Sequence, residues 1–268
     1  MRFRLLQRKL PAGSTRFFIL STISFAIHCT NVIADTGIQQ LSDTYVERWI
    51  EFYPSEAFTN GHAKSAWRFE NFSEARVADW VAYNSEVAAK LETTDENFSI
   101  QDAIDSRVLL RQSLLELERW KRDRVLLNQA IFYAELISQA LTYVLVRSQF
   151  TPEEKVDILL VRLRGIQSLS ELGRARLENG SQQRTRRAVN ILEQTLSFYE
   201  DSLPLLATGW LSGKAKPELD EEIRNTVKAV NALVAHINNQ VLPNASIPDK
   251  FTNQDYAQIG RASCRERV

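Results

Sequence analysis

The stretch TPEEKVDILLVRLRGIQSLSEL, residues 151–172, decides the fold class, because it joins a helix start to a helical hydrophobic period. Thr151 can cap the helix, Pro152 suits its first position, and Glu154 can reach back to the cap. Behind this start, apolar residues recur mostly three or four positions apart: Val156, Leu159, Leu160, Leu163, Ile166, Leu169 and Leu172. The pattern predicts an amphipathic α-helix with one buried face.

The same period continues on both sides of this helix, and Gly and Pro are scarce and fall at helix boundaries. We predict further helices over the following ranges: 39–52, 73–91, 101–120, 125–148, 189–203 and 223–241. Residues 54–72 are predicted to form a loop, with Pro54 ending the first helix. No stretch alternates as a half-buried strand would, and no repeat of fixed period occurs. We therefore expect an all-α fold, with about seven helices in a bundle or layered helical array.

The last predicted helix carries a narrow apolar seam, formed by Ile223, Val227, Val230, Val234, Ile237 and Val241. Spacings of four and three residues are typical of a stripe that packs against a partner helix. If the chain is part of a longer protein, we expect some of these partners to lie outside the chain.

Composition and charge limit the partners. Hydrophobic residues make up 44% of the chain, which is enough for a sizeable core. Residues 35–258 contain 25 basic and 32 acidic side chains, so their net charge is about −7. Nucleic-acid binding needs a basic surface that meets phosphates. We therefore expect no nucleic-acid partner.

The N-terminus has the pattern of a secretory signal. A basic segment, residues 1–9, precedes an interrupted apolar stretch that ends in VIA, with cleavage expected after Ala34. The alternative is an N-terminal membrane anchor, although the unbroken apolar run is short for a span. Cys29 is a poor lipidation site, because His28 stands where a small residue is wanted. We expect residues 1–34 to be a signal peptide, and the mature chain to be periplasmic or secreted and free of the membrane.

The last ten residues, IGRASCRERV (259–268), differ from everything before them. They follow neither a helical nor a strand period. The string resembles the translation of a widely used sequencing-library adapter. We therefore expect the genuine sequence to stop near Gln258 and the helical part of the protein to span residues 35–258.

The mature body contains few residues suited to catalysis. The two cysteines of the chain, Cys29 and Cys264, fall in the leader and the tail. Two histidines remain: His62, either a ligand or a turn residue, and His236, which we expect to be half-exposed. Neither belongs to an HExxH pair, and no P-loop, GxGxxG or GxSxG motif occurs. We assign no catalytic, cofactor-binding or metal-binding residue from these patterns.

Several motifs, taken in order, resemble a bacterial family known as the domain of unknown function 885. The first is ERWIEFYPSEAFTNGHAKSAWRFENFSEA, residues 47–75, whose turn at Pro54, Ala57, Gly61 and His62 is similar to the family's Pro-x-x-Ala-x-x-x-Gly-x-His turn. Further matching segments follow: 102–118, with Asp105 and the pair Leu109 and Leu110, then 150–166, 233–246 and 249–258. A glycine that the family usually has in the last segment is absent. The resemblance covers residues 39–258.

This resemblance implies a zinc metallopeptidase-like protein whose HExxH helix lies in a C-terminal half that this chain lacks. No position here matches those zinc and catalytic motifs. It follows that the chain alone would be inactive and hold no cofactor, whereas the full-length parent would hold zinc. Its partners would be the missing half and a peptide substrate. The alternative, from another functional class, is a periplasmic helical binding module without catalysis.

Overall fold

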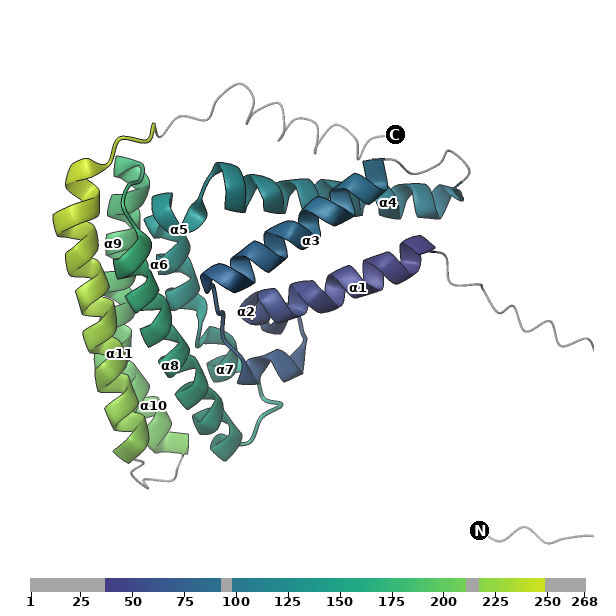
Figure 1. Cartoon of the computed structure of the whole chain (residues 1–268). Coiled ribbons are helices and arrows are strands. Elements are labelled where there is room, and N and C mark those ends of the chain that lie inside the picture. Colours follow the sequence, from purple (N-terminus) through teal and green to yellow (C-terminus); the bar gives the residue numbers. More distant parts are fainter. Residues whose placement is uncertain (1–36, 93–97, 211–216, 249–268) are drawn as a thin grey trace, which may run out of the picture. The chain divides into compact units, whose positions relative to one another are not determined.

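The computed structural model describes residues 37–92, 98–210 and 217–248. Over these ranges the chain consists of helices and connecting turns, with no β-strand (Figure 1). Ser181 and Ile247 form an isolated bridge. The predicted all-α fold is confirmed. The predicted signal peptide and the tail, residues 259–268, lie outside the described residues, as do Cys29 and Cys264.

The helices are short to medium in length. The α-helices are α1 (Gly37–Phe52), α2 (Pro54–Thr59), α3 (Glu74–Glu92), α4 (Ile100–Leu117), α5 (Val125–Asn128), α6 (Ala130–Gln139), α7 (Thr142–Val146), α8 (Pro152–Arg176), α9 (Gln182–Ser197), α10 (Leu203–Trp210) and α11 (Pro217–His236). Short 3₁₀ turns are η1 (Ala63–Trp67) and η5 (Leu242–Asn244), and π turns are η2 (Glu118–Arg122), η3 (Phe198–Ser202) and η4 (Ile237–Val241). None of the described helices is long and apolar enough to cross a bilayer.

The helices form two packed groups. In the first, α8 packs on α11, α6 packs on α9, and contacts between α9 and α11 close a four-helix arrangement. In the second, α4 packs on both α3 and α1. Figure 1 shows α6, α8, α9 and α11 side by side in teal, green and yellow, and α1, α3 and α4, in purple to teal, running at an angle to them.

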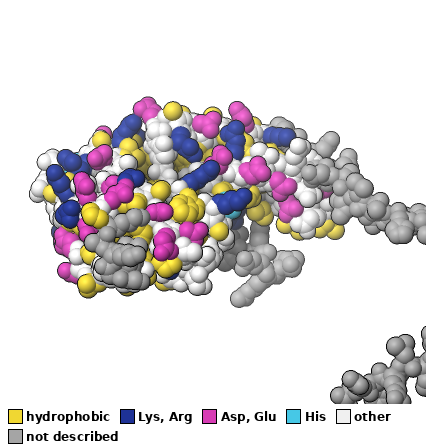
Figure 2. Space-filling model, turned by 90° about the horizontal axis from the view of Figure 1, so that it is seen from below, with side chains coloured by type: hydrophobic (Ala, Val, Ile, Leu, Met, Phe, Trp, Pro, Cys, Tyr) yellow, Lys and Arg dark blue, Asp and Glu magenta, His cyan; other side chains and the backbone are white. Residues whose placement is uncertain are grey.

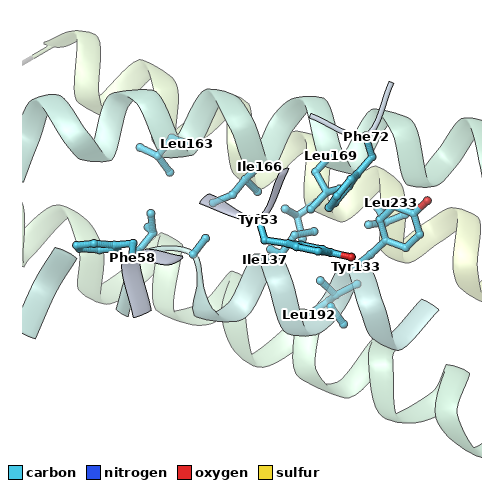
Figure 3. Close-up of a cluster of buried hydrophobic side chains, with 14 of the residues drawn as sticks. Tyr53, Phe58, Phe72, Tyr133, Ile137, Leu163, Ile166, Leu169, Leu192 and Leu233 are labelled. Carbon is cyan, nitrogen blue, oxygen red and sulfur yellow. The ribbon is translucent and has the colours of Figure 1, made fainter. Parts of the chain in front are cut away.

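Helix α8 is the centre of the first group, and its start is as predicted. The Thr151 hydroxyl accepts a hydrogen bond from the Glu154 amide at 3.2 Å, and the Glu154 carboxylate accepts one from the Thr151 amide at 2.8 Å. Leu163, Ile166 and Leu169 of this helix point into a cluster with side chains from α6, α9 and α11 (Figure 3). Burial of this face, rather than local propensity, provides most of the stability of such a helix.

The apolar seam of the last long helix is covered within the chain. Ile223, Val230, Val234, Ile237 and Val241 are buried, and Val227 is half-buried. The partners of α11 are α8 and α9. The expectation that some seam partners lie outside the chain is therefore wrong for this helix, because two helices of the same chain cover it.

The predicted continuous helix over 125–148 is wrong, because the structure divides it into α5, α6 and α7. At the first break, the carbonyl oxygen of Leu127 accepts hydrogen bonds from the amides of Glu178 and Asn179, which follow α8. At the second break, the carbonyl of Ala140 accepts a hydrogen bond from the side chain of Arg162. Donors from distant segments thus take carbonyls that a continuous helix would have used itself.

The predicted loop over 54–72 contains two short helices, α2 and η1. Pro54 occupies the first turn of α2, where its missing amide hydrogen costs nothing. Gly61 ends α2 with a φ of 106°, and the amides of Gly61 and His62 donate to the carbonyls of Phe58 and Ala57. This is a glycine-dependent C-terminal cap. A helix of six residues is too short to show a hydrophobic period, so the pattern could not reveal it.

Candidate functional site

Arg162 is the centre of a buried polar network that joins α8 to α2, to η1 and to the end of α6. Its side chain is 1% exposed, and it donates hydrogen bonds to the carbonyl oxygens of Ala66 at 3.1 Å, Ala140 at 2.7 Å and Ser65 at 3.3 Å. A fourth bond, of 3.1 Å, goes to the Ser55 hydroxyl. Burial lowers the pKa of Arg162 to about 10, so the guanidinium remains charged at neutral pH.

The negative charge opposite this guanidinium comes from Glu70, and Ser55 links the two. The Glu70 carboxylate accepts hydrogen bonds of 2.7 Å from the amide and from the hydroxyl of Ser55. Burial raises the pKa of Glu70, and the two hydrogen bonds from Ser55 and the charge of Arg162 partly oppose that rise. This network uses its donors and acceptors internally, which is the arrangement of a structural clamp.

A second buried network surrounds Glu116, which is 4% exposed on α4. One carboxylate oxygen accepts hydrogen bonds from the Tyr53 hydroxyl at 2.6 Å and from the indole nitrogens of Trp80 at 2.8 Å and Trp120 at 3.1 Å. Burial, and then the charge of Glu116, raise the pKa of Tyr53 well above its usual range. The phenol therefore stays protonated and serves as a donor.

Aromatic rings enclose this carboxylate. Phe52 stacks on Trp80 with ring centroids 4.9 Å apart and meets Tyr53 edge-on at 4.8 Å. Phe72 and Trp120 complete the cluster at a centroid distance of 5.3 Å. The network and its rings hold the end of α1, the middle of α3 and the end of α4 together. They therefore fix α1 and α4 relative to each other.

A groove opens between α1 and α4 beside this network. Its cavity volume is about 770 Å³, and Glu56 of α2 lies at one end. Its apolar walls come from Val46 and Trp49 of α1 and from Val108 and Leu109 of α4. Val46 is 53% exposed and Val108 is 63% exposed, whereas Leu109 is buried. The groove therefore presents uncovered apolar side chains on helices that are rigidly supported.

Within the described part of the chain, the charged residues that line this groove are all acidic: Asp43, Glu56 and Asp105. A second, smaller pocket of about 330 Å³ shares Trp49, Glu56 and Gln112 with the groove and therefore adjoins it. Its single base, Arg119, lies within 3.4 Å of the Tyr53 hydroxyl and 4.0 Å of the Glu116 carboxylate. On the face seen in Figure 2, basic and acidic side chains are intermixed.

The two candidate histidines lie in separate segments, and neither lines this groove. His62 is exposed in the turn after α2, and its Nδ1 lies 2.8 Å from the hydroxyl of Ser65. His236 is half-buried near the end of α11, and its Nε2 lies 2.9 Å from the carbonyl oxygen of Leu177. Both positions favour turn and packing roles.

The described residues do not fit a zinc site. Among them, no three His, Cys, Asp or Glu side chains converge in a way that could hold a metal ion. A zinc site needs three or four such ligands. The acidic residues of the groove do not form such a group either, although they line one cavity.

Comparison with known proteins supplies a fold relationship. No family model matches the chain, and no curated protein matches it. A solved structure of a protein from Shewanella oneidensis, described as a lipoprotein of unknown function, is similar with a TM-score of 0.64 and 17% sequence identity. The alignment covers 76% of this chain and 37% of that protein, so this chain spans little more than a third of its length. At this identity the likeness shows the fold alone.

Sequence patterns missed Arg162, Glu70, Glu116 and the groove. Arg162 and Glu116 could have been found from the sequence, because each is a charged residue at a position where the helical period expects an apolar one. Arg162 follows Leu159 by three residues and precedes Ile166 by four. Glu116 shares the buried face of its helix with Leu109, seven residues earlier. A charge on such a face is buried only with partners.

Proposed function

We propose that residues 37–248 form an exported interaction module that binds a ligand in the groove between α1 and α4. The observation that carries this proposal is the groove itself, with a volume of about 770 Å³. It falls in the size range of ligand sites, and its exposed Val46 and Val108, with the half-buried Trp49, give a ligand apolar surface to bury. The Glu116 network supports both walls, so binding would require little reorganisation.

A binding role suits this site better than catalysis. The buried polar groups beside the groove, Tyr53 and Glu116, direct their hydrogen bonds at each other and at two tryptophans. The high pKa of the Tyr53 phenol opposes its use as a base at neutral pH. Export is supported by the basic and apolar pattern of residues 1–34 and by the fold likeness to a protein described as a lipoprotein.

A second candidate keeps the expectation from the family resemblance. In it, the described helices form one wall of the substrate cleft in a longer zinc metallopeptidase-like protein. Its support is the ordered set of motifs over residues 39–258 and the greater length of the structurally similar protein. Reading the intact gene beyond codon 258 tests it. An HExxH helix there would support the candidate, and a coding sequence without one would remove it.

The binding proposal is tested with a neutral apolar dye, Nile red, and the purified full chain. A Val46→Ser, Val108→Ser variant should weaken dye binding about tenfold, because two exposed apolar side chains lose contact with the probe. The matched control, Val146→Ser with Leu205→Ser, removes apolar groups that are 69% and 75% exposed outside the groove. The control should bind like the wild type. Equal weakening in both variants, or no binding to the wild type, would contradict the proposal.

A further inference from the structure

The groove continues into an exposed apolar stripe along α4. Its members, at helical spacing, are Ile100, Ile104, Val108 and Leu115, which are 84%, 49%, 63% and 41% exposed. Isolated exposed apolar residues are ordinary, but four on one helix face form a patch. From Ile100 to Leu115 the stripe extends roughly 22 Å along the helix. It is too long for a small molecule to cover and matches about four turns of another helix.

The groove also has a definite charge. Among the residues that the structure describes, its three charged lining residues, Asp43, Glu56 and Asp105, are carboxylates, and no base lines it. Asp105 accepts a hydrogen bond of 2.9 Å from Gln101. Among the described residues of the adjoining pocket the base is Arg119, which contacts Tyr53 and Glu116 and also acts electrostatically on Glu56. A partner that lies in the groove therefore meets a negative wall.

From these two observations we infer that the occupant of the α1–α4 groove is a basic amphipathic helix of a partner protein. Its apolar face would cover the α4 stripe together with Val46 and Trp49, as helix-in-groove complexes do with anchors three and four residues apart. Its Lys or Arg residues would lie along the edge that faces Asp43, Glu56 and Asp105. This inference rests on the proposed binding function of the groove and adds the chemistry of the ligand.

The test uses four fluorescein-labelled peptides of about 15 residues, which is the length of the stripe. Three share one amphipathic pattern of leucines, with Lys, Gln or Glu at every polar position. The fourth has the composition of the Lys peptide in a scrambled order without helical period. Binding to the purified full chain is measured by fluorescence anisotropy at low and at high salt. We expect the Lys helix to bind most tightly and the Glu helix most weakly, with the difference falling as salt rises.

Two variants place the effect in the groove. Asp43→Asn, Glu56→Gln, Asp105→Asn should weaken binding of the Lys helix about tenfold, the order expected for three partly screened charge pairs. This variant should bind the Gln helix as tightly as the wild type does. The matched control, Glu171→Gln, Glu193→Gln, Glu221→Gln, changes the net charge equally at exposed positions outside the groove and should retain tight binding.

Several outcomes would overturn the inference. Equal binding of the Lys and Gln helices would show that the groove does not prefer a basic partner. Equal binding of the scrambled peptide would show that the partner need not be helical. Equal weakening by the control variant would place the site elsewhere. If Nile red binds at the groove but no peptide does, the occupant is wrong while the proposed function stands. If Nile red does not bind, the proposed function itself fails.

Discussion

Arg162 donates a 2.7 Å hydrogen bond from Nη1 to the carbonyl oxygen of Ala140, 22 residues earlier in the chain. The carbonyl lies just after α6, at the point where the predicted helix over 125–148 breaks. The same side chain reaches Ser55 and the carbonyls of Ser65 and Ala66. One buried guanidinium thereby joins three segments that are far apart in sequence.

Replacement of Arg162 by Met should lower the free energy of unfolding by about 3–5 kcal/mol, the usual cost of breaking a buried charged network. The change leaves buried carbonyls without a donor and Glu70 without its counter-charge. Urea denaturation measures the effect. Arg164→Met is the matched control on the same helix, because Arg164 is 52% exposed and pairs with Glu218 and Glu222 at the surface. Its loss should change the free energy of unfolding far less than the loss of Arg162, because exposed ion pairs are screened by solvent. Similar costs for both variants would contradict the assigned role of Arg162.

Glu70 should make stability depend on pH. Burial raises its pKa in the folded state above the ordinary value of 4.5. Between the pKa of Glu70 in the unfolded chain and its higher pKa in the folded chain, the folded chain binds more protons. Stability therefore decreases as pH rises through this range. Below pH 4.5 the contribution of Glu70 to stability is fully present. Denaturation midpoints of the wild type and of Glu70→Gln should differ in this slope, with the variant showing the flatter profile from pH 4.5 upward. Parallel profiles would exclude Glu70 as the source.

Gly165 should not tolerate a side chain. A Cβ atom at this position of α8 would lie 2.4 Å from the Phe69 ring and 2.5 Å from its Cβ. Gly165→Ala should therefore destabilise the fold by roughly 1–3 kcal/mol, the cost of overpacking. Gly209→Ala is the control, because Gly209 is exposed on α10 and nothing lies within 4 Å of the added atom. It should stabilise the fold by about 0.5–1 kcal/mol through lower backbone entropy of the unfolded state. Thermal melts of both variants measure these changes. Equal shifts of the melting temperature would contradict the close packing of Phe69 against Gly165.

The leader should be removed on export. Its basic start, apolar stretch and VIA ending predict that the mature chain begins near Asp35. N-terminal sequencing of protein from the cell envelope or medium measures this directly. Ala34→Arg should block cleavage, because the peptidase requires a small residue there. Cytoplasmic protein that retains Met1 would contradict export, and exported protein that retains Met1 would favour the anchor.

The sequence alone determined the fold class and much of the helix order. Thr151 and Glu154 set the start of α8 through contacts only three residues apart, and Ser99 caps α4 in the same local way. The period of apolar residues gave the buried faces of α8 and α11. These features depend on neighbours within a few turns of helix, so they can be recognised without the rest of the fold.

Only the tertiary structure decided where the chain breaks and where its groove lies. The end of α6 depends on a donor from α8, and the burial of Glu116 depends on Tyr53 and Trp80, 63 and 36 residues away. The groove arises because α1 and α4 pack together and leave Val46 and Val108 uncovered. Hydrogen bonds and cavities between distant segments leave no local period, because they are set by how helices meet and not by what each helix contains.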